Sequence, residues 1–440
     1  MSFYSEELPY RADPASYFAA VADLPCAAWL DSGGLQRFDI ITAAPMQILS
    51  QQDGTEGDVP ALRAALGSAL PAIPDIPFAG GLLGYWSYDW GLALHGMTPG
   101  LSGATLPELQ LGLYDWALVL DHTEARARLV SHCRFKETLP LLAQLSSRLR
   151  APAVFTPPDF SVAGDIVFDL TPTTYQRAFA QVERYLHNGD CYQINLAQRF
   201  AARAEGNALA AYLALRKLSP APYAAFLDFP GIQVLSASPE QFLRVENEQV
   251  VTRPIKGTRP RGVDPDTDRA LAQDLATHPK DRAENLMIVD LLRNDLGKHC
   301  VPGSVNVPEL FQVESYASVH HLVSTIIGQL LPGHHALDLL RDSFPGGSIT
   351  GAPKRRAMEI IDQLESHRRG LYCGSIGYVG FDGNMDTNIA IRTLTYSDGQ
   401  IQGWAGGGIV ADSEWQAEYQ ETLDKAAPLL KLLRDFGATC

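Results

Sequence analysis

Short runs of apolar residues, several of them alternating with polar positions and ending in turn residues, predict β-strands along much of the chain. In the first part of the chain, strands are expected at 37–43, 111–121, 127–133, 191–200, 224–228, 232–236, 242–246 and 249–253. Glycines among aromatic residues at 78–89 predict a further strand, at a place where another backbone approaches closely. Longer strands are expected at 316–330, 374–381, 385–396 and 400–410.

Segments with helix-start and helix-end signals predict helices between these strands. They are expected at 139–149, 172–188, 208–218, 282–296, 336–344, 351–364 and 415–436. The middle of the 282–296 segment is almost entirely apolar, so this helix is expected to be buried. Because hairpins and helices follow each other in mixed order, the pattern favours an α+β fold over a parallel, doubly wound sheet.

A proline-rich segment at 151–158 divides the chain into two regions. Residues 1–150 are expected to form an N-terminal lobe, and residues 165–437 a larger second domain. The sequence contains neither an internal repeat nor a low-complexity tract.

Composition narrows the class of protein more than its function. The formal net charge of −15, with no local run of Lys or Arg to offset it, argues against a nucleic-acid partner. The six cysteines lie far apart without a CxxC pair, which predicts reduced thiols in a cytoplasmic protein. The N-terminus lacks the basic and apolar regions of a signal peptide, and no apolar run reaches membrane-spanning length.

Three ionisable residues between positions 236 and 296 are candidate site residues. Glu240 and Lys256 follow short apolar strands, and Glu284 lies in the apolar helix. A charge next to buried apolar chain is costly unless it meets a partner charge, a metal or a ligand. Each residue alone is most simply a local ion pair, but three together are more typical of a reaction site.

The last helix carries three acidic residues, Glu414, Glu418 and Glu421, at a spacing that places them on one face. The local pattern favours a solvated acidic face near the helix N-terminus, with Glu421 paired to Lys425. The alternative is that these carboxylates and Glu284 bind Mg²⁺, which prefers hard oxygen ligands.

Two glycine-rich runs resemble nucleotide-binding loops only superficially. The run at 345–354 lacks the Gly-Lys-Ser/Thr ending of a phosphate loop, and the run at 403–408 is followed by a strand instead of a helix. The first leaves free N–H groups at a helix start that could hold a carboxylate. The second is, by itself, best explained as a tight turn or bulge, although its small residues would let backbone amides touch an anionic ligand.

One arginine and one histidine add to the candidate residues. Arg392 lies in an otherwise apolar segment and cannot lose its charge, so it needs a carboxylate from the protein or from a ligand. His320 and His321 are neighbours on a predicted strand and therefore point to opposite faces, so only one of them can line a site.

Taken together, four motifs resemble those of the chorismate-utilising enzymes. They are PIKGTRPRG at 254–262, ENLMIVDLLRNDL at 284–296, SITGAPK at 348–354 and EYQET at 418–422. The motifs are long and the resemblance spans most of the chain, which makes it specific. It implies the fold of anthranilate synthase component I, a large α/β sandwich of antiparallel sheets with outer helices. It also implies that residues 165–437 form a chorismate-binding catalytic domain.

Two positions point to one reaction within this family. Lys256 stands where anthranilate synthases carry alanine, and Gln193 stands where isochorismate and salicylate synthases carry a water-activating lysine. The resemblance therefore implies amination of chorismate at C4, in the para-aminobenzoate branch of folate synthesis. The alternatives are amination at C2, as in anthranilate synthases, and a catalytically silent subunit that binds chorismate for regulation. The intact set of charged residues counts against a silent subunit, which has no physical need for costly buried charges.

The resemblance also implies a role for each candidate residue. Lys256 would form a covalent adduct at C2 of chorismate, and Glu240 would protonate the departing C4 hydroxyl. Mg²⁺ would be held by Glu284 and Glu421, with Glu418 acting through water. The residues that match substrate-binding positions of the family are Thr258, His321, Thr350, Tyr372, Arg392, Gly406, Gly407 and Gly408. Of these, Arg392, Tyr372 and the glycine amides would hold the enolpyruvyl carboxylate.

Two further partners are implied. None of the six cysteines lies in the Gly-x-Cys-x-Gly setting of an amidotransferase nucleophile, so ammonia is expected from a separate glutamine amidotransferase subunit. Relatives bind tryptophan in a segment that residues 30–40 resemble, which makes Ser32 and Asp39 candidate tryptophan-binding residues. In the para-aminobenzoate branch this pocket could be structural only.

Overall fold

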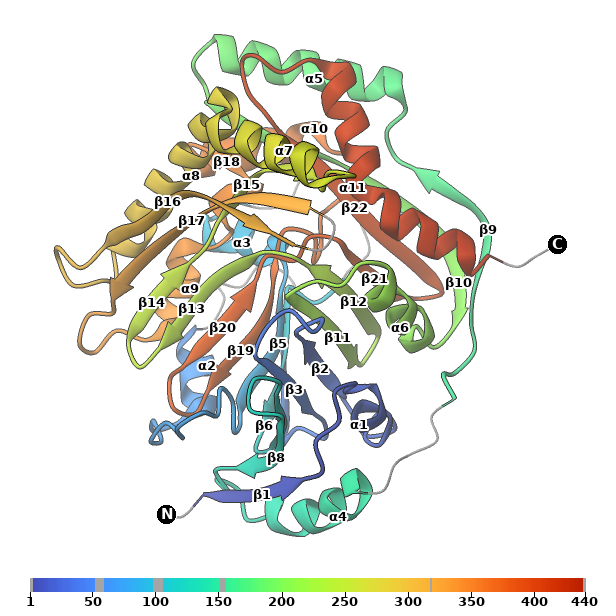
Figure 1. The fold of residues 1–440 in the computed structure, drawn as a ribbon, viewed down its shortest axis with the longest axis vertical. Coiled ribbons are helices and arrows are strands. Elements are labelled where there is room, and N and C mark those ends of the chain that lie inside the picture. Colours follow the sequence, from blue (N-terminus) through green and yellow to red (C-terminus); the bar gives the residue numbers. More distant parts are fainter. Residues whose placement is uncertain (1–2, 52–58, 98–105, 151–155, 317–318, 438–440) are drawn as a thin grey trace.

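The computed structural model of the chain describes residues 3–51, 59–97, 106–150, 156–316 and 319–437. These residues form two antiparallel sheets that pack face to face, with helices on their outer faces (Figure 1). The predicted α+β class and the predicted sandwich of antiparallel sheets with outer helices are confirmed.

The larger sheet has twelve strands in the order β1-β8-β7-β3-β2-β11-β12-β21-β22-β10-β18, with β9 paired to β10. Their bounds are β1 Tyr4–Leu8, β2 Ala28–Asp31, β3 Phe38–Thr42, β7 Ala117–Asp121, β8 Arg126–Ser131, β9 Phe160–Phe168, β10 Gln193–Gly206, β11 Tyr223–Phe229, β12 Ile232–Ser238, β18 Gly351–Ala352, β21 Thr393–Ser397 and β22 Gln400–Ile409. The long antiparallel pairing of β10 with β22 places the glycine-rich run 403–408 inside a strand. That run is therefore neither a nucleotide loop nor a tight turn.

The smaller sheet has ten strands in the order β15-β17-β14-β13-β20-β19-β5-β6-β4, with β16 paired to β17. Their bounds are β4 Gln47–Gln51, β5 Gly81–Trp86, β6 Leu109–Tyr114, β13 Gln241–Glu246, β14 Gln249–Thr252, β15 Ile255–Pro260, β16 Asn306–Ser315, β17 Val319–Gln329, β19 Ser375–Gly380 and β20 Met385–Asn388. The glycine-rich segment that includes β5 pairs on both sides, with β6 and β19, as its composition predicts.

The helices are α1 Ala15–Ala19, α2 Val59–Leu66, α3 Tyr88–Leu94, α4 Thr138–Arg150, α5 Pro172–His187, α6 Leu209–Leu218, α7 Pro265–Thr277, α8 Pro279–Gly297, α9 Ala336–Ser343, α10 Lys354–Leu364 and α11 Trp415–Asp435. Figure 1 shows α5, α7, α10 and α11 gathered at one end of the molecule, with β1 and α4 at the other. Within the described ranges, no helix is both long and apolar enough to cross a membrane. A cytoplasmic location stays a prediction.

Strands in the middle of each sheet are apolar on both faces, because one face packs against the other sheet and the opposite face packs against helices. In β7, Leu118 and Leu120 pack with the helices outside the larger sheet, whereas Ala117 and Val119 pack between the two sheets. A strand buried on both faces has a near-continuous apolar sequence and loses the polar alternation of a half-exposed strand.

The predicted boundary near residue 150 does not separate the two sheets. In the larger sheet β2 pairs with β11, and in the smaller sheet β5 pairs with β19, so both sheets contain strands from both regions. The division into a lobe at 1–150 and a catalytic domain at 165–437 stays a prediction about the sequence regions.

Several elements differ from the expectation. The predicted strand 385–396 is wrong as a single element, because β20 and β21 belong to different sheets and the chain turns between them at Arg392, whose φ is 50°. The predicted strand 111–121 is wrong in the same way, because β6 belongs to the smaller sheet and β7 to the larger one. Several elements lie outside the predicted ranges, among them strands β15 and β16 and helix α7. The β15 sequence, IKGTRP, contains no apolar alternation that would mark it as a strand.

A buried ion pair between Glu365 and Arg369, which follow α10, connects β10 to the segment that precedes α10. Arg369 Nη2 lies 2.7 Å from Glu365 Oε1, and both side chains are 1% exposed. Arg369 also donates to the carbonyls of Asn195 and Ile349, at 2.7 and 3.1 Å, and Glu365 accepts from the Ala197 amide at 3.0 Å. The two side chains therefore balance each other's charge and also provide hydrogen-bond partners for backbone groups of two segments.

Replacing Arg369 with methionine is expected to lower the free energy of unfolding by about 3–5 kcal/mol, because the Glu365 carboxylate would stay buried without its counter-charge. Urea denaturation followed by circular dichroism measures this loss. Arg355→Met on α10 is the matched control, since the Arg355–Glu359 pair is exposed (67% and 35%) and is expected to contribute less than about 1 kcal/mol. Equal losses in the two variants would contradict the prediction.

Candidate active site

Most of the predicted site residues line one cavity of about 720 Å³. It lies where β15, β17 and β22 meet helices α8 and α11. The predicted residues in its lining are Glu240, Lys256, Thr258, Glu284, His321, Tyr372, Arg392, Gly406, Gly408, Glu418 and Glu421. The fold thus brings together residues that are up to 181 positions apart, from Glu240 to Glu421.

Glu240 lies in the turn between β12 and β13, where its backbone is held on both sides. Its carbonyl accepts a hydrogen bond from the Ile389 amide at 3.0 Å, and its amide donates to Ser238 Oγ at 3.3 Å. Burial raises the pKa of Glu240, and the nearby Lys256 ammonium offsets this effect only in part. Burial therefore shifts Glu240 towards the protonated carboxylic acid, which can donate a proton.

Lys256 lies on β15 and directs its amine into the same cavity. Its Nζ donates a hydrogen bond to the Ser348 carbonyl at 3.0 Å. Burial lowers the pKa of Lys256, although Glu284 and Glu240 oppose this effect through their charges. Burial therefore shifts Lys256 towards the neutral amine, which is the nucleophilic form.

An irregularity in β15 sets the position of Lys256. The pairing of β15 with β17 shifts its register between Ile255 and Thr258. Within this bulge Gly257 has a φ of 80°, and a Cβ added there would lie 2.8 Å from Leu275 Cδ1. Only glycine suits this conformation and this space, so the Lys-Gly pair determines how the lysine is presented.

The acid and the amine form a complementary pair. The pKa of Glu240 is raised and that of Lys256 is lowered, because burial disfavours the charged form of each group. A neutral amine is a nucleophile, and a neutral carboxylic acid is a general acid. One cavity can therefore attack an electrophilic carbon and protonate a leaving group.

Three carboxylates on two helices line the same cavity. Glu284 projects from α8, and Glu418 and Glu421 project from α11. Lys280 Nζ lies 3.5 Å from Glu418 Oε1 and 4.0 Å from Glu284 Oε1. Lys425 Nζ binds Glu421 Oε1 at 2.6 Å, which confirms the ion pair expected from their spacing. These carboxylates are thus partly neutralised by lysines.

This donor set fits a hard divalent cation such as Mg²⁺. A Cβ added at Gly407 would lie 3.0 Å from Glu418 Oε2 and 3.6 Å from Glu421 Oε1, so both carboxylates face the same stretch of β22. Burial raises the pKa of Glu284, and a bound cation would favour its charged form. In the described parts of the chain, no three His, Cys, Asp or Glu side chains already surround one metal position. Water and substrate would therefore supply part of the coordination, as is usual for Mg²⁺.

Glu414, the third acidic residue of the predicted helical face, is not part of this site. It is exposed at the N-cap of α11 and does not line the cavity. The spacing places three acidic residues along one stretch of sequence, but the helix begins only after the first of them.

Arg392 supplies a partly buried cation to the cavity. Burial lowers its pKa, and the Glu240 charge opposes this effect. Among the described residues, its guanidinium makes no hydrogen bond or ion pair, although it lines the cavity. Because a guanidinium keeps its charge when buried, this group can receive a carboxylate from a ligand. Nearby, the rings of Tyr372 and Trp404 stack with centroids 5.9 Å apart and form an apolar wall.

His321 of β17 also faces the cavity. Its Nδ1 lies 2.9 Å from Thr258 Oγ1. Burial, together with the charge of Arg392, lowers the pKa of His321 to about 4, so the imidazole is neutral at pH 7. The neighbouring His320 contacts Asp268 instead, at 3.0 Å, as the alternation along a strand requires.

Two predicted substrate-binding residues lie outside the lining. Thr350 is fully buried, and its hydroxyl donates to the Gly346 carbonyl at 3.0 Å. Gly407 lies on β22 between the lining residues Gly406 and Gly408. Contact of Thr350 or Gly407 with a substrate stays a prediction.

Several cavity residues lie outside the predicted set. Asn195 lines the cavity, and its buried Nδ2 has no hydrogen-bond partner in the described ranges. Ser348, Trp404 and Lys280 also line the cavity. An asparagine inside an apolar strand is the same kind of signal that identifies Glu240, so Asn195 could be found from the sequence. The positions of the other three depend on contacts between segments that are distant in sequence.

Gln193, the residue that separates branches of the family, lies behind the cavity wall. A side chain added to Gly408 would clash with the Gln193 amide, so the two residues are packed together. Both amide atoms of Gln193 are buried and lack a hydrogen-bond partner among the described residues. The glycine therefore lets this strand pass close to a buried amide.

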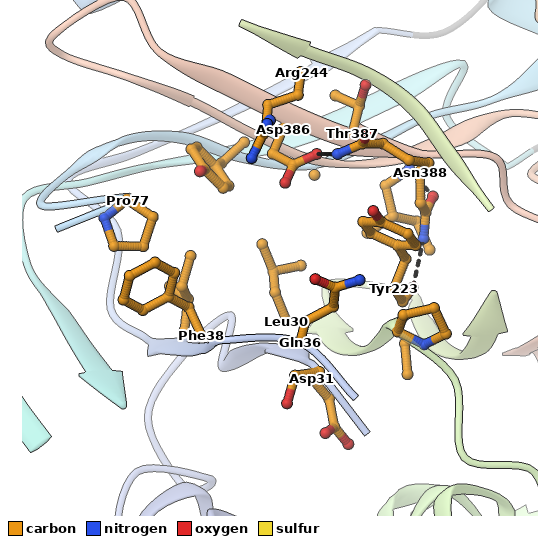
Figure 2. A pocket seen from close by; sticks show the side chains of 18 of the residues that line it. Leu30, Asp31, Gln36, Phe38, Pro77, Tyr223, Arg244, Asp386, Thr387 and Asn388 are labelled. Atoms are coloured by element: carbon orange, nitrogen blue, oxygen red, sulfur yellow. Dashed lines mark hydrogen bonds between the residues drawn. The ribbon is translucent and has the colours of Figure 1, made fainter. Parts of the chain in front are cut away.

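A second cavity, of about 290 Å³, lies between the two sheets (Figure 2). Leu30 and Phe38 line it from the larger sheet, and Asp386 and Arg244 lie side by side on the opposite wall. Burial raises the pKa of Asp386 to about 6. Ser32, a predicted tryptophan-binding residue, is part of the lining. The cavity is thus lined by both apolar and polar side chains, and one of them is a carboxyl group whose pKa is raised by burial.

Asp39, the other predicted tryptophan-binding residue, supports this cavity from behind. Its Oδ1 accepts a hydrogen bond from the Ser32 amide at 2.5 Å, and its Oδ2 contacts His122. The bond to Asp39 raises the pKa of His122. Asp31 likewise points away from the cavity in Figure 2 and binds Arg216 Nε at 2.6 Å. Ser32 is therefore held in place by Asp39, which lies outside the lining, whereas Asp31 belongs to the lining although its carboxylate binds Arg216.

Comparison with known proteins agrees with this geometry. The chain matches the chorismate binding enzyme family over residues 25–431. It is 48% identical over 449 residues to aminodeoxychorismate synthase component 1 of Escherichia coli strain K12, covering 97% of each chain. It is 46% identical over 451 residues to aminodeoxychorismate synthase component 1 of Salmonella typhimurium, covering 97% of this chain and 98% of that one.

A solved structure agrees with the fold. Anthranilate synthase component I from Streptococcus pneumoniae TIGR4 superposes with a TM-score of 0.79 at 33% identity, covering 89% of this chain and 91% of that chain. The family resemblance predicted from the motifs is thereby confirmed. Since the family model and both relatives span nearly the whole chain, the chain belongs to the chorismate binding enzyme family.

Proposed function

We propose that the chain aminates chorismate at C4 to give 4-amino-4-deoxychorismate, on the route to para-aminobenzoate and folate. Similarity over 97% of the chain to aminodeoxychorismate synthase component 1 of two bacteria supports this reaction. The observation that carries it is the shared cavity of Lys256 and Glu240. Their pKa values are shifted in the directions that amine attack and proton donation require.

In the proposed reaction, Lys256 first displaces the C4 hydroxyl of chorismate. Its neutral Nζ forms a bond to C2, the ring double bonds shift, and the C4–O bond breaks as Glu240 gives its proton to the oxygen, which leaves as water. The proton that the new C2–N group loses restores Glu240. Ammonia then forms a bond to C4, the double bonds shift back, and Lys256 leaves C2 as a neutral amine with the proton from Glu240. The new C4 ammonium group gives one proton back to Glu240, which restores the acid. The net change is the replacement of a hydroxyl by an amine with release of water.

The remaining cavity residues would bind and orient the substrate. Mg²⁺ held by Glu284 and Glu421, with Glu418 acting through water, would bind the ring carboxylate and draw electron density from the ring. Arg392 would hold the enolpyruvyl carboxylate, which supplies the anionic partner that its guanidinium lacks among the described residues. The other groups proposed to contact the substrate are Thr258, His321, Thr350, Tyr372 and the backbone amides of Gly406, Gly407 and Gly408.

Ammonia would come from a glutamine amidotransferase subunit. The names of the relatives describe a component, which supports a partner subunit. Burial raises the pKa of Cys26, Cys191 and Cys300 to about 11 and that of Cys373 to about 12. An amidotransferase nucleophile needs the opposite shift, so these thiols are unsuited to release ammonia from glutamine.

The test is incubation of the purified chain with chorismate, Mg²⁺ and ammonium, followed by chromatographic separation of the products. We expect 4-amino-4-deoxychorismate, which needs a separate lyase to release pyruvate. Fluorescent anthranilate as the product would instead favour amination at C2. Absence of turnover both with ammonium and with an added amidotransferase subunit would favour a silent, chorismate-binding subunit.

We further propose that the second cavity binds tryptophan, with Ser32 in its lining and Asp39 behind it. Calorimetry with tryptophan, after unfolding and refolding to remove bound ligand, should show one binding site. Asp386→Asn is expected to weaken binding about tenfold if the buried carboxylate pairs with the amino group. Chorismate amination, which uses the other cavity, should change little in this variant. The lack of any binding heat in the refolded wild-type chain would contradict the proposal.

A further inference from the structure

Lys280 lies between two of the carboxylates that are proposed to hold the metal. It belongs to the first turn of α8, four residues before Glu284. Its Nζ is 4.0 Å from Glu284 Oε1 and 3.5 Å from Glu418 Oε1. Because Glu418 belongs to α11, the ammonium group connects the two helices whose carboxylates face the cavity.

The other two lysines of this cavity are held differently. Lys256 donates a hydrogen bond to the Ser348 carbonyl, and Lys425 donates one to the Gly406 carbonyl. Each is therefore anchored to the backbone as well as attracted by charge. For Lys280, the contacts found within the described ranges are those with the two carboxylates, and 42% of its side chain is exposed. Its position is set by charge attraction, and the chain has room to swing into solvent.

We infer that Lys280 is a resident counter-ion that competes with the divalent cation for Glu284 and Glu418. This inference rests on the proposed metal role of Glu284, Glu418 and Glu421. A cation bound to these carboxylates would repel an ammonium group a few ångströms away, because charges in a partly buried site are weakly screened. Lys280 must therefore move out when the metal binds, and this lowers the affinity for the metal alone.

The competition couples the metal to the substrate. The ring carboxylate of chorismate adds a negative charge beside the metal position, which favours the divalent cation over the single charge of Lys280. By linkage, metal and substrate then each strengthen the binding of the other. The metal would be held tightly mainly when the substrate is present.

A purely structural ion pair predicts the opposite result. If Lys280 only tied α8 to α11, its removal would loosen the carboxylates and weaken metal binding. If Lys280 competes, its removal takes away a repulsive charge and strengthens metal binding. The direction of the change therefore separates the two roles.

The experiment is calorimetric titration of the whole chain with MgCl₂ without chorismate, repeated with Mn²⁺ followed by electron paramagnetic resonance. Lys280→Gln removes the charge, and we expect the Kd for Mg²⁺ to fall about tenfold. Lys280→Arg keeps the charge, and its Kd should stay within about twofold of the wild-type value. Lys431→Gln is the matched control, since Lys431 pairs with Asp435 at the far end of α11 and its loss changes the net charge equally.

Glu421→Gln in the same titration separates this inference from the proposed metal site. If Glu421→Gln does not weaken Mg²⁺ binding, the metal site is wrong and the role of Lys280 is wrong with it. If Glu421→Gln weakens binding but Lys280→Gln leaves the Kd unchanged or raises it, only the role of Lys280 is wrong. Binding that is too weak to measure in the wild type but measurable and Glu421-dependent in Lys280→Gln supports the inference. Binding too weak to measure in both overturns it.

Discussion

Replacing Lys256 with alanine is expected to lower the rate of C4 amination by at least about a thousandfold, because the variant lacks the amine that would displace the hydroxyl. Chorismate binding should change far less, since Arg392 and the proposed metal, and not Lys256, would hold the two carboxylates. The measurement is the rate of 4-amino-4-deoxychorismate formation at saturating ammonium. Calorimetry with chorismate in the absence of ammonium measures binding separately.

Lys256→Gln is the matched variant for this test. Glutamine can still donate a hydrogen bond towards the Ser348 carbonyl, which Lys256 contacts at 3.0 Å, but it has no nucleophilic amine. Both variants should therefore lose activity to a similar extent. Loss in the alanine variant alone would assign Lys256 a positioning role through the segment at Ser348. Unchanged product formation in both would remove the lysine from the mechanism.

The alanine variant also tests the choice between amination at C4 and at C2. Lys256 stands where anthranilate synthases carry alanine, so the variant resembles them at this position. Any anthranilate that it forms is detectable by fluorescence. Appearance of anthranilate with loss of the C4 product would show that this side chain selects the carbon that is aminated.

The convergence of Glu240, Lys256 and Glu284 could be predicted from the sequence because its physical basis is local. Each residue carries a charge in an apolar segment, and the cost of burying such a charge can be judged from its neighbours in sequence. The structure places all three in one cavity, with the pKa values of Glu240 and Lys256 shifted in opposite directions. Their exact partners could not be predicted in this way.

The environment of Arg392 shows where local reasoning ends. The apolar segment around it predicts one continuous strand, yet β20 and β21 lie in different sheets and Arg392 turns the chain between them. The need for an anionic partner follows from the side chain, whereas the turn depends on the pairing of β20 with β13 and of β21 with β12. These partners come from 140 or more residues earlier, beyond the reach of a local pattern.

Lys280 and Thr350 also show that local sequence does not determine which side chains reach the site. One lies at the site without a sequence signal, and the other belongs to a motif but points elsewhere. Lys280 has an ordinary helix-surface sequence context, and only the tertiary fold brings its Nζ within 3.5 Å of Glu418 Oε1 on α11. Thr350 belongs to a motif that resembles the family, but its hydroxyl is used within its own loop, on the Gly346 carbonyl. A motif indicates which segments meet at a site, whereas the direction of each side chain depends on tertiary packing.

Replacing Glu240 with glutamine is expected to lower the rate of C4 amination by about a hundredfold to ten-thousandfold, because glutamine has a similar shape but cannot give up a proton to the leaving hydroxyl. Burial raises the pKa of Glu240 in the folded chain. The active, protonated form is therefore present below that pKa and is lost as pH rises through it. In the wild type, the rate at constant free ammonia should fall on the alkaline side, and in Glu240→Gln this fall should disappear.

Stability measurements distinguish this loss of chemistry from a loss of structure. A carboxyl group whose pKa is raised by folding contributes stability that is full below its unfolded pKa and is lost as pH rises through the folded pKa. Glutamine carries no such dependence, so Glu240→Gln should be at least as stable as the wild type at pH 8 in urea denaturation. A variant that is inactive and equally stable supports proton donation by Glu240. If Glu240→Gln keeps its activity and the rate still falls on the alkaline side, another group in the cavity donates the proton. The proposed function would then no longer be supported by the pairing of Glu240 with Lys256.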